Sequence, residues 1–139
     1  MEARAHLVVG ADGKHSRIAA AVGAAKYHVR PSTTCNVYSY WRDFAAPHTH
    51  LFVRDGRFYV VLPTNGGLTY LGVVWPVAEW RRVLSNLEPT FHSALLEIPW
   101  IAERLAGASR VERYTGTGPV QEFFAPVNIG RIVGERHAA

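Results

Sequence analysis

Three residues near the N-terminus have the types and spacing of a turn that binds a phosphate or a ribose. Asp12 and Gly13 follow the apolar residues 7–9, and Ser16 begins a run of alanine and aliphatic residues that Gly23 ends. This pattern predicts a buried strand, a glycine turn and a helix, with Asp12 facing the helix N-terminus. A helix N-terminus favours anionic groups. An ordinary strand-to-helix turn uses the same residue types, so both interpretations stay open.

Aromatic residues on predicted strands form a second candidate site. Tyr38, Tyr40, Tyr70 and Trp75 lie in segments of strand-forming composition. They could line a pocket for an aromatic ligand, because such pockets are lined mainly by apolar and aromatic side chains. Aromatic residues on strands also serve as core or interface residues, and this alternative stays open.

Other reactive side chains do not form a recognisable site. His48 and His50 would point to the same side of a strand, but no Cys, Asp or Glu at a typical spacing completes a zinc site. We therefore expect surface histidines and no metal. Cys35 is the single cysteine and is expected to be a buried structural thiol. His15 and Ser16 lack the setting of an activated nucleophile, so no catalytic residue is named.

The middle of the chain predicts an antiparallel sheet. Segments 34–44, 51–53, 58–62 and 68–75 have strand-forming composition. The sequences Asp55-Gly56 and Asn65-Gly66-Gly67 are typical of hairpin turns, so we expect a four-stranded meander. Both faces of these strands are apolar, and both therefore need a cover.

Residues 76–105 predict one of these covers. Apolar residues recur at helical spacing in three short segments, which Pro89, Pro99 and Gly107 delimit. Segment 24–34 is expected to be a connection, and short strands are expected at 110–115, at 123–124 on the main sheet, and at 132–133 beside residues 7–9. The predicted fold class is α+β: an antiparallel sheet of about five strands with two or three helices on one face, plus an N-terminal strand-turn-helix.

These patterns resemble the class A flavin-dependent monooxygenases, the p-hydroxybenzoate-hydroxylase-like family. Asp12, Gly13 and Ser16 are similar to the family motif that lies near the FAD pyrophosphate and is implicated in NAD(P)H use. The aromatic strand at 38–41, the turn at 63–69 and Trp75-Pro76 before a helix are similar to the family's substrate-domain sheet. The resemblance implies one domain over residues 1–139, with remnants of the FAD domain at 5–23 and 131–139. It also implies cofactor contacts at the first three residues and substrate contacts at the aromatic residues.

Two features of that family are missing. No Gly-x-Gly-x-x-Gly turn precedes residue 7, and Glu135 stands where the family has an aspartate that binds the ribityl chain. We therefore expect a truncated FAD-dependent monooxygenase-like oxidoreductase that is inactive and binds no cofactor alone. Its parent reaction would hydroxylate an aromatic or similar organic substrate with NAD(P)H and dioxygen. The alternative is a non-enzymatic binding or assembly module that uses its apolar sheet face for a partner subunit or an apolar ligand.

The composition and charge of the chain limit the kinds of partner that we expect it to bind. With 139 residues, 48% hydrophobic and 19% charged, the chain can bury the core of a globular domain. The net charge of +4 comes from scattered basic residues, which argues against nucleic-acid binding. No apolar run approaches the roughly 20 residues that cross a bilayer. We expect a cytoplasmic protein, consistent with the single cysteine, that forms a homodimer through the uncovered sheet face.

Overall fold

The computed structural model describes residues 9–13, 15–119 and 122–124, which form two compact units. The smaller unit contains residues 9–13, 15–30 and 122–124, and the larger unit contains residues 31–119. The predicted pairing of residues 7–9 with 132–133 lies outside the described residues, except that Val9 is described and is not in a strand. Glu135 and the segment 131–139 also lie outside them.

The smaller unit has one short helix and one two-stranded ladder. Helix α1 (Arg17–Ala21) begins after Ser16, as predicted, and Gly23 follows its end with a φ of +62°. Strand β1 (Tyr27–Arg30) pairs antiparallel with β8 (Glu122–Phe124). The predictions of a connection at 24–34 and of a main-sheet strand at 123–124 were therefore wrong. Tyr27 and Val29 alternate with His28 and Arg30, but four residues are too short a run to indicate a strand by pattern alone, and all four are exposed.

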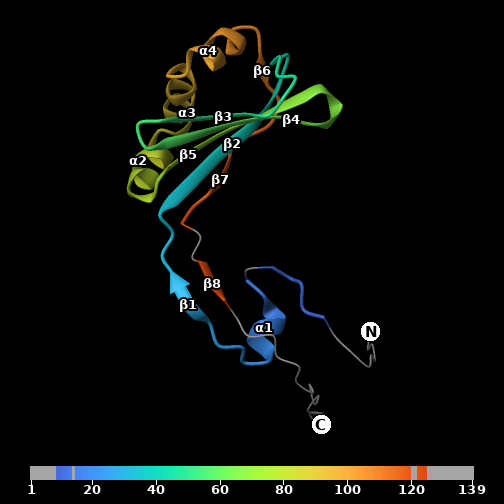
Figure 1. Cartoon of the computed structure of the whole chain (residues 1–139), viewed down its shortest axis with the longest axis vertical. Helices are drawn as coiled ribbons and strands as arrows, with labels where there is room; N and C mark the ends of the chain where they lie inside the picture. The colour runs from blue at the N-terminus through green and yellow to red at the C-terminus, as the bar shows by residue number, and fades with distance from the viewer. Residues whose placement is uncertain (1–8, 14, 120–121, 125–139) are drawn as a thin grey trace. The chain divides into compact units, whose positions relative to one another are not determined.

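The larger unit is built on a six-stranded antiparallel sheet, which confirms the α+β fold (Figure 1). Its main strands are β2 (Thr34–Arg42), β3 (His50–Arg54), β4 (Arg57–Pro63) and β5 (Leu68–Pro76). Two short strands, β6 (Ser109–Arg110) and β7 (Thr115–Thr117), pair with β2 at different points. The continuous strand predicted at 110–115 is thus wrong, since residues 111–114 separate the two pieces.

The strand order is β3-β4-β5-β2-β6, which corrects the predicted meander. Strand β2 pairs with β5, from Thr34 opposite Pro76 to Arg42 opposite Leu68, and does not pair with β3. Both β2 and β5 have nine residues, so this pairing forms a longer ladder than the five-residue β3 could offer. The central position also buries alternate residues of β2, whereas β3 stays at an edge with Leu51 and Val53 exposed.

Helices cover one face of this sheet. The 3-10 turn η2 (Val77–Glu79) leads into α2 (Trp80–Ser85), α3 (Leu87–Leu96) and α4 (Pro99–Leu105), which confirms the three predicted helices. All three lie on the same side of the sheet (Figure 1). We call this side the helix-covered face. A second 3-10 turn, η1 (Asn65–Gly67), joins β4 to β5, and Gly66 there has a φ of +68°. No helix in the described part of the chain is long and apolar enough to cross a bilayer.

Side chains of the sheet alternate between two faces. Val37, Tyr59, Leu71, Val73 and Trp75 point to the helix-covered face and are fully buried. Their neighbours in each strand point to the opposite side, the open face. Its apolar and aromatic residues are mostly half-buried, and they include Tyr38, Tyr40, Leu51, Val53, Phe58, Val60, Leu62, Leu68, Tyr70 and Val74.

Candidate functional site

Three tyrosines gather on the open face where β2 and β5 pair. Tyr38 and Tyr70 are stacked, with ring centroids 4.9 Å apart and ring planes at 28°. Tyr40 meets Tyr70 edge-on, at 5.8 Å and 77°, and meets Tyr38 at 6.1 Å and 88°. We call these three residues the tyrosine cluster. All three are half-buried, so part of each ring stays accessible to a ligand.

Two residues that the sequence analysis did not single out position this cluster. Gly72 lies opposite Tyr38 in the ladder, and a Cβ atom at Gly72 would lie 2.6 Å from the Cε1 and hydroxyl atoms of Tyr70. The Tyr70 ring therefore lies over Gly72, where any larger residue would displace it. At the far end of the ring, Asn36 donates from Nδ2 to the Tyr70 hydroxyl at 3.5 Å. A glycine inside a long strand is the sequence signal that could have identified this close approach.

The polar end of the cluster is neutral. Burial is the main cause that raises the pKa of Tyr70, the Asn36 hydrogen bond opposes it, and Tyr38 and Tyr40 add to the increase. Its hydroxyl therefore keeps its proton near neutral pH. The Oδ1 atom of Asn36 is buried and has no hydrogen-bond partner among the described residues. Flat aromatic surface beside uncharged polar groups suits a planar aromatic ring that carries a hydroxyl.

Trp75 does not join the tyrosines. It lies on the helix-covered face, fully buried, with its ring centroid 6.3 Å from that of Phe91. Residues 70 and 75 are five apart in one strand, and the period of two places them on opposite faces. Of the four aromatic residues predicted to line one pocket, the structure therefore brings together Tyr38, Tyr40 and Tyr70 only.

The predicted phosphate turn is occupied by its own side chains. Asp12 accepts hydrogen bonds from the backbone N–H groups of Arg17 at 2.7 Å and Ile18 at 3.3 Å. The Ser16 hydroxyl donates to Asp12, and it accepts from the N–H group of Ala19 at 2.9 Å. These contacts cap α1, and the bond from Ser16 is the main cause that lowers the pKa of the Asp12 carboxyl.

This arrangement does not fit the diphosphate of FAD. A diphosphate would need the free N–H groups at the start of α1, and three of these already bind Asp12 or Ser16. The ionised Asp12 would also repel a second anion at the same place. Gly13 fits the turn because its φ is +80°, a conformation that other residues rarely adopt. The turn as described is a helix cap.

The histidines and the cysteine take separate positions. Among the described residues, no three His, Cys, Asp or Glu side chains are placed to hold a metal. His50 packs against Trp100, with ring centroids 4.1 Å apart, whereas His48 is exposed. Cys35 is buried, as predicted, and its thiol donates to the Trp75 carbonyl at 3.7 Å. Burial raises the pKa of this thiol, so it is not activated as a nucleophile.

Comparisons with known proteins support the fold. No family model and no curated protein sequence matches this chain. The solved structures that resemble it include a mutant of halogenase PltM in complex with FAD (TM-score 0.60, 15% identity), the flavin-dependent halogenase CmlS (0.55, 19%) and the flavin-dependent brominase Bmp2 (0.59, 14%). The chain shares the fold of part of the flavin-dependent halogenases. The matches cover 78%, 78% and 76% of this chain, but only 26%, 20% and 29% of those proteins. At such identities the likeness establishes the fold and leaves the activity to be proposed.

Proposed function

We propose that this chain is the substrate-binding part of a flavin-dependent oxidoreductase and that its tyrosine cluster binds an aromatic substrate. The stacked pair of Tyr38 and Tyr70 on the open face carries the proposal. The shared fold with FAD-dependent enzymes supports the class of reaction. The sequence resemblance to class A monooxygenases favours hydroxylation of the ring, with NAD(P)H and dioxygen as co-substrates.

Each residue of the tyrosine cluster would make a different contact with the substrate. The exposed parts of Tyr38 and Tyr40 offer ring surface, against which a substrate ring gains stacking and apolar contact. The neutral Tyr70 hydroxyl marks the end of the cluster where a hydroxyl group of the substrate would be placed. FAD would supply the oxygen chemistry when bound. Its diphosphate is not held by the turn at Asp12, so we expect the isolated chain to bind FAD weakly or not at all.

A titration of the whole chain with phenol tests this proposal, with cyclohexanol as the non-aromatic comparison. We expect phenol to shift the NMR signals of Tyr38 and Tyr40 and to bind more tightly than cyclohexanol. Replacing Tyr38→Ala should weaken phenol binding about fivefold, because an aromatic pair contributes about 1 kcal/mol beyond its buried area. Tyr27→Ala, in the smaller unit, is the matched control and should leave the affinity unchanged. Equal phenol affinity in Tyr38→Ala and in the unmodified chain would contradict the proposal.

We also propose a second function for the open face, as an assembly surface. Leu51 is 57% exposed and Val53 is 76% exposed, and both continue the apolar open face to the edge of the sheet. Exposed apolar residues that extend a larger apolar surface are typical of contacts between proteins. This function does not require a flavin or a substrate.

A further inference from the structure

The helix-covered face contains a cavity of about 320 Å³. Arg57 of β4 and Trp75 of β5 line it from the sheet. Arg82 of α2, Asn86 between α2 and α3, and Thr90 and Ser93 of α3 line it from the helices. The tyrosine cluster lies on the open face, so this cavity is a separate place on the larger unit.

The lining is rich in hydrogen-bond donors. Two guanidinium groups and the indole N–H of Trp75 can only donate. The one carboxylate in the lining, Glu97, is already used: its Oε1 accepts from Arg57 at 2.6 Å and its Oε2 accepts from Tyr59 at 2.8 Å. A ligand that fits this lining must therefore bring acceptor atoms.

Two buried donors lack an acceptor. The Nε1 atom of Trp75 and the Nε atom of Arg57 have no hydrogen-bond partner among the described residues. Trp75 is fully buried, so water does not reach its indole N–H as the side chains stand. Buried donors without a partner are costly and are rare in folded proteins. An acceptor that enters beside Arg57, with a shift of that side chain, would satisfy them.

The start of α3 adds polar side chains to the lining. This helix has ten residues, and the side chain of Asn86 at its N-cap makes no capping hydrogen bond. Glu88 lies in its first turn, Pro89 has no N–H group, and the N–H of Thr90 already donates to the Asn86 carbonyl at 3.0 Å, so the donors that this helix end offers to the cavity are side chains. The hydroxyl groups of Thr90 and Ser93 also make no hydrogen bond within the part of the chain that the structure describes, and they lie three residues apart on the cavity side of the helix.

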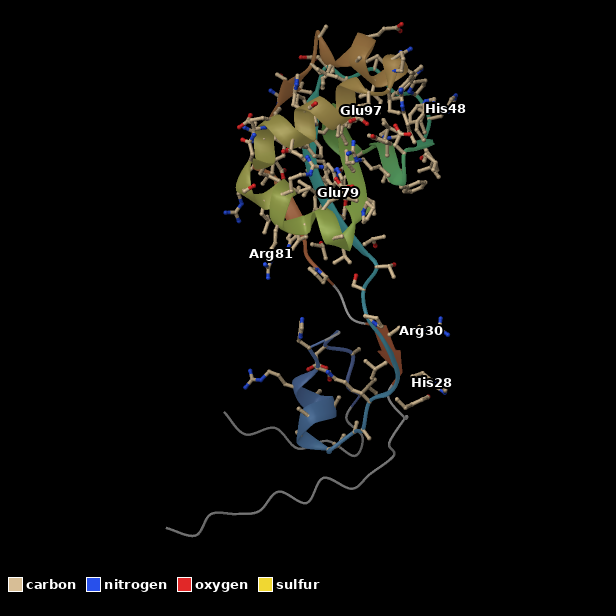
Figure 2. All side chains as sticks on the ribbon, turned by 90° about the vertical axis from the view of Figure 1, so that its left-hand side faces the viewer. His28, Arg30, His48, Glu79, Arg81 and Glu97 are labelled. Atoms are coloured by element: carbon tan, nitrogen blue, oxygen red, sulfur yellow. The ribbon has the colours of Figure 1, made fainter. Side chains whose placement is uncertain are left out.

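We propose that this cavity binds a small oxyanion, a phosphate or a carboxylate group. Glu79 accepts from Arg82 and also from Arg57, at 3.5 Å for the latter, so two guanidinium groups meet two carboxylates here. The attraction then comes from the donors that lack an acceptor rather than from net charge. In Figure 2, Arg81 lies apart from Glu79 and Glu97. The proposal does not depend on the function proposed for the tyrosine cluster.

A titration of the isotope-labelled whole chain at constant ionic strength tests this site. Its three arms are inorganic phosphate, acetate and chloride, each followed by the backbone amide signals of Asn86, Thr90 and Ser93. We expect phosphate or acetate to shift these signals at concentrations up to about 20 mM, the range of weak binding to a small site. A response to phosphate alone assigns the site to phosphorylated ligands, and a response to both assigns it to oxyanions in general.

Two neighbouring arginines provide a matched pair of variants. Arg82→Gln removes a guanidinium from the lining and should weaken oxyanion binding at least tenfold, because it removes a charge-assisted hydrogen bond. Arg81→Gln removes the same charge outside the lining and should leave binding unchanged. Circular dichroism and urea unfolding check that both variants fold. Equal shifts with chloride, no shifts with either oxyanion, or equal weakening in the two variants would each overturn the proposal.

Discussion

At the scale of single residues, the chemistry of Tyr59 and Glu97 links stability to pH. Burial is the main cause that raises the pKa of Tyr59 to about 12 from an ordinary 10.0, and the hydrogen bond to Glu97 adds to it. A pKa that is higher in the folded state means that the folded chain holds this proton more tightly. The stabilisation from neutral Tyr59 is therefore complete below about pH 10 and is lost as the pH rises to about 12.

We expect the free energy of unfolding to fall by about 2 kcal/mol between about pH 10 and pH 12 through this residue. Urea unfolding at a series of pH values measures the decrease. Tyr59→Phe should remove it, and Glu97→Gln should reduce it because the carboxylate no longer disfavours the phenolate. Glu103→Gln, at an exposed glutamate, is the control and should not change it. An unchanged pH profile in Tyr59→Phe would show that other groups cause the decrease.

At the scale of elements, strand β5 depends on the absence of a side chain at Gly72. Gly72→Ala would push a Cβ atom against the Tyr70 ring, which lies 2.6 Å from that position. We expect a loss of about 1–3 kcal/mol in the free energy of unfolding, because overpacking forces side chains from their preferred rotamers. The stacking of Tyr38 on Tyr70 should be lost as well. Thermal unfolding, together with the NMR signals of the tyrosine cluster, measures both effects.

A double-mutant cycle separates this clash from a general effect of alanine in the strand. In a Tyr70→Ala background the obstructing ring is absent, so Gly72→Ala should cost much less there. Gly107→Ala is the control outside the strand, because a Cβ atom at Gly107 meets nothing within 4 Å. An equal cost of Gly72→Ala in both backgrounds would show that the Tyr70 ring is not the cause.

At the scale of the whole molecule, the open face of the larger unit carries exposed apolar residues such as Leu51 and Val53. We propose that two copies of the chain associate through it, since two-fold pairing is the commonest way in which identical chains cover such a surface. Light scattering at micromolar concentration should report a dimer. Val53→Asp places a charge on the open face and should yield a monomer. Leu84→Asp, at a 50% exposed residue of α2 on the other side of the sheet, is the matched control and should remain dimeric. A monomer for the unmodified chain at high concentration would contradict the proposal.

The sequence by itself determined the features that depend on local chemistry. The hairpin turn at Asp55-Gly56 follows from backbone conformations that few residues adopt, and the helices between Pro76 and Gly107 follow from apolar spacing and prolines. The helix cap at Ser16 was likewise readable, because capping needs only one side chain and the backbone beside it. These signals were sufficient for the α+β fold class.

Only the tertiary structure decided the features that join distant segments. Strands β2 and β5 pair along their full length, although β3 and β4 lie between them in the sequence. No local pattern encodes this pairing of distant strands. The roles of Asn36 and Gly72 appear only when β2 and β5 lie side by side, because each acts on the ring of Tyr70. At the Asp12 turn, only the hydrogen bonds in the structure distinguish a helix cap from an open anion-binding site. Residue types and spacing are the same in both cases, and the difference lies in which atoms already have partners.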